Sequence, residues 1–512
     1  MSIPLITAIR SYLQSDGLVI LPEIELLLFG LGILLIDFWL ERKEKYLNAG
    51  MALAGTLFSG FTLWKLRGAV ALRADLYGFH QSAIVDSFFI FFGALFLAAT
   101  ALVILLSVKY LEIEEEQEGE YYALLLFACV GMMFMASGVD LIVLFLGLET
   151  MALSFYVLTG FLRREKRSNE AALKYVLLGA FSSGILAYGF SFLYGMSAST
   201  DIRRIAMMLG RRKEFIESIA RHPQSATAQF DPAVLQLLPI VAFVLVAVGL
   251  FFKIAAVPFH QWAPDVYEGA PTPVTTYVSV ASKTASFALL LRLFTSVFEP
   301  SRDTWMYLIA GIAVASLTWG NLAALTQTNV KRLLAYSSIS HVGYILLALV
   351  AWNKTAFTGI AYYLLSYVFM TAGAFAVIIV LRQKGIIGEE LDDLNGLYQR
   401  SPAAAVLLLI FMLSLAGIPP TAGFMGKYFI FLSLIESHHP VLAVFAVLYI
   451  VPALYYYFRI VVHAWLKQPG EAPRPVMTSA QAVALAVAVF VTLAAGLYPE
   501  PFTRLAQYAF GQ

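Results

Sequence analysis

The sequence has 512 residues, of which 60% are hydrophobic and 13% are charged. An ordinary soluble domain has roughly 25% charged residues, so this composition excludes a soluble globular protein and indicates a membrane protein. The 34 Lys and Arg residues nearly balance the 33 Asp and Glu residues, which leaves no basic excess for binding nucleic acid. A single cysteine, Cys129, excludes an intrachain disulfide framework and any zinc or iron–sulfur site built from several thiolates.

Long apolar runs recur along the whole chain. A bilayer-spanning helix needs about 20 mostly apolar residues. We therefore predict an all-α polytopic membrane protein with about fourteen spans, at residues 18–40, 49–66, 86–107, 121–137, 140–162, 170–196, 235–257, 273–298, 304–325, 333–352, 356–382, 402–436, 440–466 and 478–498. The first run has no basic n-region and no A-x-A cleavage motif before it, so we expect it to be retained as a helix.

The connections between spans carry the orientation signal. The short loops after the first, fifth and ninth predicted spans carry clusters of basic residues. These are Arg42, Lys43 and Lys45; Arg163, Arg164, Lys166 and Arg167; and Lys331 and Arg332. The positive-inside rule places these loops in the cytoplasm and both termini outside. The longest connection, 197–232, has apolar residues at roughly helical spacing from Asp201 to Arg221. This pattern predicts either an amphipathic helix lying on a membrane or partner surface, or an ordinary solvated loop helix.

Proline interrupts two of the spans. The seventh reaches Pro258, and the twelfth breaks at Pro419 and Pro420. These are the fourth members of helices 4–8 and helices 9–13, and interrupted spans at matching positions in two halves are typical of repeated transporter folds. Because five is odd, consecutive five-helix units must insert with opposite topology. We predict N-terminal helices 1–3 in residues 1–120, inverted five-helix repeats in 121–298 and 299–466, and helix 14 in 467–512.

Several ionisable residues lie deep in the predicted spans: Glu149, Lys174, Lys253, Lys283, His341 and Lys427. Each charge near a helix centre costs roughly 2.5–3.5 kcal/mol on insertion scales, so these positions indicate a function. Burial disfavours an ammonium and a nearby carboxylate stabilises it, which is the chemistry of a proton relay. We predict that Glu149, as the only deep carboxylate, pairs directly with Lys253, and that all of these residues except Lys174 line one continuous hydrated path.

Structural roles compete with the relay at each position. Lys174 lies near a span end and could extend to the interface, and Glu149, Lys253, Lys283 and Lys427 could form purely structural ion pairs. His260 and His341 could be packing histidines. Arg292, Arg459 and His463 lie toward span ends and are best interpreted as anchors, while the acidic run 112–118 is typical of a solvated loop.

Four segments resemble the antiporter-like membrane subunits of respiratory complex I. They are LKYVLLGAFSSGILAYGFSFLYG, LFFKIAAVPFHQWAPDVYEGAPTPVTTYVSVASKTASFALLLRL, NVKRLLAYSSISHVGYILLAL and LSLAGIPPTAGFMGKYFIF. The stretch PDVYEGAPTPVT is more similar to the subunit N type, also called subunit 2, than to its paralogues L and M. The likeness runs from about Tyr121 to His463, and the chain lacks the long lateral helix typical of subunit L.

This resemblance implies a fourteen-helix proton-translocating subunit with two inverted repeats inside an NADH:quinone oxidoreductase. It assigns relay roles to Glu149 in helix 5, Lys174 in helix 6, Lys253 in helix 7, Lys283 in helix 8 and Lys427 in helix 12. It also implies other membrane subunits as partners. FMN, iron–sulfur clusters, NADH and quinone would bind other subunits, with no cofactor or metal on this chain. The sequence contains no P-loop, dinucleotide-binding or H-E-x-x-H motif.

Two alternatives of a different kind remain open. A subunit of an Mrp-type cation/proton antiporter, or a free-standing transporter, would use the same buried lysines. A purely scaffolding role fits poorly with the insertion cost of these residues. We expect a bacterial inner membrane, with multiple passes and both termini on the periplasmic side.

Overall fold

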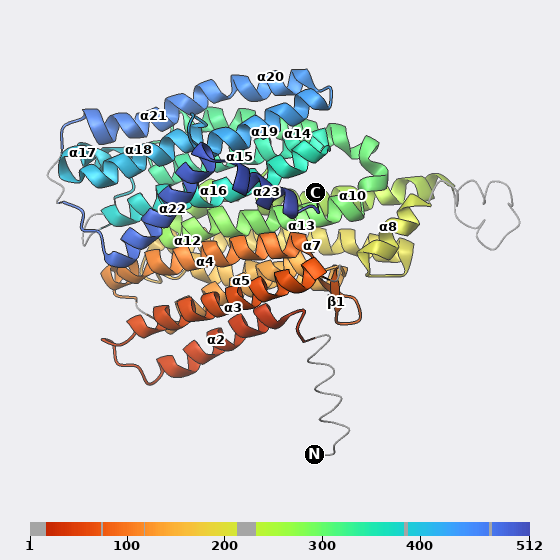
Figure 1. Cartoon of the computed structure of the whole chain (residues 1–512), viewed down its shortest axis with the longest axis horizontal. Helices are drawn as coiled ribbons and strands as arrows, with labels where there is room; N and C mark the ends of the chain where they lie inside the picture. The colour runs from red at the N-terminus through yellow and green to blue at the C-terminus, as the bar shows by residue number, and fades with distance from the viewer. Residues whose placement is uncertain are drawn as a thin grey trace, which may run out of the picture.

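The computed structural model describes residues 17–72, 75–116, 118–211, 232–382, 388–469 and 474–511. Most of these residues are helical, and the long helices run side by side along the longest axis of the molecule (Figure 1). Within the described part of the chain the only sheet is an antiparallel hairpin of β1 (Leu76–Gly78) and β2 (Ala83–Val85).

The described helices fall into those before and those after residue 298. Those before residue 298 are α2 (Leu21–Asp37), α3 (Tyr46–Leu72), α4 (Ser87–Glu114), α5 (Gly119–Ser137), α6 (Leu141–Thr159), α7 (Lys166–Ser197), α8 (Ile202–Gly210), α10 (Pro232–Ile254), α11 (Trp262–Gly269), α12 (Thr272–Tyr277), the π-helix η2 (Val278–Ser282) and α13 (Lys283–Ser296). After them come η3 (Glu299–Ser301), α14 (Arg302–Ala324), α15 (Val330–Ala351), α16 (Lys354–Leu381), η4 (Leu391–Leu394), α17 (Leu397–Arg400), α18 (Pro402–Ala416), α19 (Ala422–Glu436), α20 (Pro440–Leu448), α21 (Ile450–Leu466), α22 (Ser479–Leu497) and α23 (Glu500–Tyr508).

Among the described residues, 11 helical segments are long and apolar enough to cross a membrane. This confirms the predicted all-α polytopic membrane fold. The remaining predicted spans correspond to α2, α3 and the interrupted pair α18 and α19, so the total of fourteen stays a prediction.

The two ends of the bundle differ in their loops. We call one end the basic-loop face, because it carries the connections that contain Arg42, residues 163–167 and residues 331–332. The other end, the hairpin face, carries β1, β2, α8 and the last described residues, and it lies at the right in Figure 1. Only α8 of the predicted amphipathic segment is described, since residues 212–231 lie outside the described ranges.

Asp201 begins α8 on the hairpin face. Its side chain accepts hydrogen bonds from the backbone N–H of Arg203 at 2.9 Å and from the Arg203 guanidinium. Burial alone would raise the pKa of Asp201, but these hydrogen bonds outweigh burial and hold the pKa below its usual value. The carboxylate therefore stays charged and satisfies the free N–H groups at the start of the helix.

The first two helices of each predicted repeat pack closely through glycine. A Cβ on Gly131 of α5 would lie 2.6 Å from the Gly147 carbonyl oxygen of α6. A Cβ on Gly320 of α14 would lie 2.6 Å from the backbone nitrogen of Ser340 in α15. Small residues let helix backbones approach in membranes. This matching contact supports a repeated architecture, although the four predicted domain boundaries remain a prediction.

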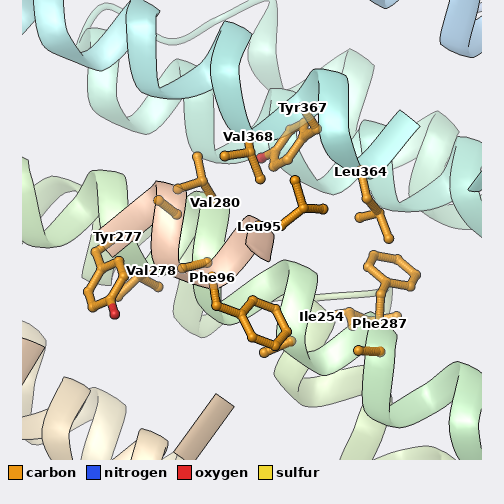
Figure 2. Close-up of a cluster of buried hydrophobic side chains, with 14 of the residues drawn as sticks. Leu95, Phe96, Ile254, Tyr277, Val278, Val280, Phe287, Leu364, Tyr367 and Val368 are labelled. Atoms are coloured by element: carbon orange, nitrogen blue, oxygen red, sulfur yellow. The ribbon is translucent and has the colours of Figure 1, made fainter. Parts of the chain in front are cut away.

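The centre of the bundle is occupied by α12, η2, α13 and α16. The most apolar stretches of these helices are completely buried inside the protein. Figure 2 shows Leu95 and Phe96 of α4 lying beside Val280 of η2 and Val368 of α16. These side chains are buried, so the interior next to η2 is closely packed and apolar. Polar groups in this region must therefore find partners within the protein.

We predict that Gly320→Ala lowers stability. The added Cβ meets backbone of α15, which cannot rotate away, so α14 and α15 must separate. Overpacking of this kind costs about 1–3 kcal/mol, measurable as a lower thermal unfolding temperature of the purified protein in detergent. Gly311→Ala, on the same helix, meets no atom within 4 Å and is the control. Equal unfolding temperatures for the two variants would contradict the close contact.

Candidate functional site

The first interrupted span consists of α10 and α11, with Pro258 in the gap between them. The Val257 backbone N–H donates to Ser316 Oγ at 3.0 Å, and Trp262 Nε1 donates to the Phe252 carbonyl oxygen at 2.8 Å. Lipid cannot satisfy backbone groups released by such a break. The protein supplies partners instead, so the break lies in a polar part of its interior.

Lys253 occupies the last turn of α10, beside this break. Its side chain is buried, and Nζ donates to the Tyr156 hydroxyl of α6 at 3.3 Å. Glu149 lies seven residues before Tyr156, on the same side of α6, and attracts Lys253 through space. One Glu149 oxygen is buried without a hydrogen-bond partner, and the described ion pairs do not include Glu149 with Lys253. The predicted direct salt bridge is therefore absent, and Tyr156 takes the contact.

The second interrupted span consists of α18 and α19, with Pro419 and Pro420 between them. Lys427 Nζ, from the second turn of α19, donates to the carbonyl oxygens of Ala416 at 2.8 Å and Leu415 at 3.3 Å. These are the last carbonyls of α18, which the break leaves without intrahelical partners. An ammonium there also interacts favourably with the negative end of the helix dipole.

Lys283 and His341 lie between the two broken spans. Lys283 begins α13, directly after η2, and Nζ donates to the Ser338 carbonyl oxygen at 3.2 Å and to the Ser338 hydroxyl. His341, one turn further along α15, has Nδ1 2.5 Å from the Tyr363 hydroxyl and Nε2 3.0 Å from the Tyr457 hydroxyl. The Tyr457 hydroxyl also bonds Ser337. Lys283 directly, and His341 through Tyr457, therefore contact neighbouring serine hydroxyls of α15.

We call Glu149, Lys253, Lys283, His341 and Lys427 the polar row. Its four cationic or imidazole members are at most 3% exposed, whereas Glu149 is half-buried. Both Lys283 and Lys427 lie within electrostatic range of His341 and disfavour a charge on its imidazole.

Aromatic residues extend from Lys253 to the first break. The Tyr156 ring contacts the Tyr175 ring at a centroid distance of 4.9 Å, and the Tyr175 ring stacks on the Trp262 ring at 4.7 Å. The structure buries Lys253, Lys283, His341 and Lys427 inside the bundle and leaves Glu149 half-buried. Whether a continuous hydrated path joins them stays a prediction.

Lys174 has a different environment from the other predicted lysines. Its side chain is 43% exposed and pairs with Asp265 and Glu170, each at 2.8 Å. Asp265 also accepts from Arg332 at 2.8 Å, so α7, α11 and α15 are joined by ion pairs near the basic-loop face. The structure therefore places Lys174 at the periphery, away from the contacts of the polar row.

The prediction that Glu149 is the only deep carboxylate is wrong. Glu23 in α2 is 1% exposed, and one of its oxygens has no hydrogen-bond partner. Its nearest side-chain partner is Ser137 at 3.5 Å. The signal was visible in the sequence, because Glu23 lies inside the first predicted span, but its position near the start of that span suggested an exposed end.

The other histidines and arginines that the sequence analysis singled out contact only neighbouring groups. Arg292 pairs with Asp86 at 2.5 Å, and Arg459 donates to the Gln327 carbonyl oxygen at 3.1 Å, as expected for anchors near helix ends. His463 Nδ1 lies 2.9 Å from the Asn395 side chain. His260 is buried against Trp319 with its Nδ1 unpartnered.

Residues 138–451 match the family described as NADH:quinone oxidoreductase/Mrp antiporter, transmembrane. The chain is 52% identical to NADH-quinone oxidoreductase subunit N 2 of Solibacter usitatus (strain Ellin6076), over 97% of this chain and 98% of that protein. It is 51% identical to subunit N 1 of Koribacter versatilis (strain Ellin345), over 97% of this chain and 96% of that protein.

Solved structures of large membrane complexes contain chains of the same fold. A chain of respiratory complex I from Thermus thermophilus, with bound Aureothin, superposes with a TM-score of 0.76 at 31% identity, covering 95% of this chain and 99% of that chain. A chain of the Mrp complex from Dietzia sp. DQ12-45-1b gives a TM-score of 0.77 at 21% identity, covering 95% and 96%. The second likeness shows the fold alone.

We predict that Tyr156→Phe destabilises the protein by about 1–3 kcal/mol, the usual effect of leaving a buried donor without its acceptor. The substitution keeps the ring and removes only the hydroxyl bonded to Lys253. Thermal unfolding in detergent measures the loss, and Tyr188→Phe, at an exposed tyrosine of α7, is the control. Equal stability of the two variants would show that the Tyr156 hydroxyl is dispensable for holding Lys253.

Proposed function

Because the chain belongs to the NADH:quinone oxidoreductase/Mrp antiporter family of transmembrane proteins, we propose that it is the subunit N of a complex I. In this role it translocates protons in the membrane arm through the polar row, while other subunits transfer electrons from NADH to quinone. FMN, the iron–sulfur clusters and both substrates bind those other subunits. The observation that carries this proposal is the burial of three lysines and a histidine in one hydroxyl-lined interior.

Charge distribution supports an orientation for the subunit. The basic-loop face carries Arg42, Lys43 and the cluster 163–167, so the positive-inside rule assigns it to the cytoplasm. Both ends of the chain then lie on the periplasmic side of a bacterial inner membrane. Neighbouring membrane subunits and lipid cover its apolar flanks, since α7 exposes Leu177 and Phe181, and α21 exposes Val451.

Lys253 is positioned to load and release a proton. Burial disfavours its ammonium form, and a nearby carboxylate favours it. Lys253 bonds Tyr156 and is attracted to Glu149 only through space, so a small movement of α6 relative to α10 changes this attraction without breaking a direct salt bridge. The Tyr156 hydroxyl can accept from the ammonium or donate to the neutral amine, which serves both protonation states.

The second repeat uses the same chemistry with different partners. Lys283 and Lys427 both disfavour a charge on His341. A neutral imidazole with a tyrosine hydroxyl at each nitrogen can accept a proton at one nitrogen and give one up at the other. His341 is therefore positioned to pass a proton between Lys283 and Lys427 while remaining neutral at rest. Lys174 acts as a peripheral ion-pair partner in this proposal.

An Mrp-type antiporter is the second candidate, because the same fold occurs in an Mrp complex. Relatives that are at least 51% identical over nearly the whole chain carry the name of an NADH-quinone oxidoreductase subunit, which favours the first proposal. The two differ in energy source: the antiporter exchanges cations without any electron transfer from NADH.

We expect Lys283→Met to lower NADH-driven quinone reduction and proton transport together, by about tenfold or more, which corresponds to about 1.4 kcal/mol in the barrier. Methionine keeps the length of the side chain but cannot titrate, so the relay cannot reset. Both rates are measured in membrane vesicles, with assembly checked on a native gel. Lys43→Met, at an exposed loop lysine, is the control.

Two results would contradict the proposal. Unchanged rates of quinone reduction and proton transport in fully assembled Lys283→Met complex would exclude Lys283 from the relay. Loss of Na⁺ or K⁺ exchange with no effect on NADH-driven electron flow would favour the antiporter instead.

A further inference from the structure

A small polar cavity lies at the basic-loop face, outside the polar row. Its volume is about 40 Å³, room for at least one water molecule. Exposed Glu165 and Arg167 stand at its mouth, and buried Lys331 and Glu389 at its inner end. Tyr110, Glu268 and Arg382 complete its polar lining, so three acidic groups face three basic groups.

Glu389 is held rigidly at the inner end of this cavity. Its carbonyl oxygen accepts from the Val330 backbone N–H at 2.7 Å. One carboxylate oxygen accepts from Lys331 Nζ at 2.9 Å and from Thr272 Oγ1 at 3.3 Å, and the other lies 4.0 Å from Arg167. Arg382 and Tyr110 also interact electrostatically with this carboxylate. Glu389 therefore contacts both the cavity and the first residue of α12.

Hydroxyls continue from Thr272 toward the polar row. Thr272, Thr276, Ser279 and Lys283 are spaced by four, three and four residues, about one helical turn each, so they lie on one side of α12, η2 and α13. All of these side chains are buried. Figure 1 shows α12 and α13 end to end in the middle of the bundle.

Tyrosine hydroxyls from neighbouring elements contact serine hydroxyls along this segment. The Ser279 hydroxyl lies 3.1 Å from the Tyr367 hydroxyl. The Tyr267 hydroxyl lies 3.3 Å from Ser338 Oγ, which itself bonds Lys283. The Thr276 hydroxyl donates to the Thr272 carbonyl oxygen at 2.9 Å, the bond to the preceding turn that a helical threonine commonly makes. The Thr272 and Ser279 hydroxyls instead contact side chains of other elements, Glu389 and Tyr367, so polar groups continue from the cavity toward Lys283.

We propose that Glu389, paired with Lys331, is the proton-loading group of this chain on the basic-loop face, and that Thr272, Thr276 and Ser279 carry its proton to Lys283. The inference rests on the proposed proton-translocating function and adds a point of entry to it. Water on the basic-loop face is the proton source.

The transfer conserves every bond except O–H and N–H bonds. The Glu389 carboxylate takes a proton from water at the cavity and becomes a neutral acid, which weakens its ion pair with Lys331; the hydroxide that remains is neutralised by the bulk water on the basic-loop face. The acid gives this proton to the Thr272 oxygen, and Thr272 passes its own hydroxyl proton inward. Thr276, Ser279 and intervening water molecules repeat this exchange. The neutral amine of Lys283 takes up the last proton, and Glu389 returns to the carboxylate.

Glu389→Gln tests the loading step in the assembled complex. We expect NADH-driven proton transport and quinone reduction in membrane vesicles to fall together by at least about fivefold, or roughly 1 kcal/mol in the barrier. Glu390→Gln, at the exposed neighbouring glutamate, is the control and should leave both rates unchanged. Full activity of assembled Glu389→Gln complex would overturn the proposal.

Variants of Thr272 distinguish a role in proton transfer from a role in structural support. They test the proposal even if Glu389→Gln does not assemble. Thr272→Val keeps the shape of the side chain without a hydroxyl, and Thr272→Ser keeps the hydroxyl without the methyl group. We expect the serine variant to transport protons at least about threefold faster than the valine variant. Equal rates, or a faster valine variant, would overturn the route. If Lys283→Met is inactive while the Glu389 and Thr272 variants are normal, the entry route fails and the proposed function stands; if Lys283→Met is also normal, both fail.

Discussion

Helix breaks inside the membrane impose the constraint on which this structure depends. Each break releases backbone carbonyls that lipid cannot satisfy, and it leaves the negative end of a helix dipole in the protein interior. Lys253 lies in the last turn of α10, and Lys427 donates to the last carbonyls of α18. At the second break the group that satisfies the carbonyls is therefore an ammonium ion that can titrate. At the first break Trp262 takes the Phe252 carbonyl oxygen, and Lys253 donates to Tyr156 instead. Each break is thus accompanied by a buried lysine, although only Lys427 satisfies the broken helix itself.

Helix α15 contributes side chains to both proposed transfer steps. Ser338 contacts Lys283, and Ser337, through Tyr457, contacts His341. A proton that reaches Lys283 therefore arrives next to the hydroxyls that lead onward to His341. The close approach of α14 and α15 at Gly320 fixes the position of this segment, since Gly320 faces the backbone of Ser340, the residue before His341. Packing in one helix pair thus determines the alignment of groups in the polar row.

Hydropathy was sufficient to find the buried charges but not their partners. Lys253, Lys283 and Lys427 stand out because a lysine inside an apolar run is costly wherever it points. Tyr156 and Glu389 carry no such signal, because a tyrosine is common in a membrane helix and a loop glutamate usually faces solvent. Their roles depend on contacts with residues 97 and 58 positions away in the chain, which periodicity cannot predict.

The two kinds of lysine in this chain show why sequence position alone misleads. Lys174 and Lys331 both belong to basic segments near span ends, yet the side chain of the first is 43% exposed and that of the second 1%. The difference arises from α11 and the residues that follow it: Asp265 in α11 pairs with Lys174, whereas the carbonyl oxygen of Ala270, just after α11, accepts from Lys331 at 2.7 Å. A peripheral ion pair in high dielectric contributes little to stability. A buried ion pair is costly unless its remaining hydrogen bonds are satisfied. The pair of Lys331 with Glu389 meets that requirement, because Lys331 also donates to Ala270 and Glu389 also accepts from Thr272. These two residues lead into the helical span that carries Lys283.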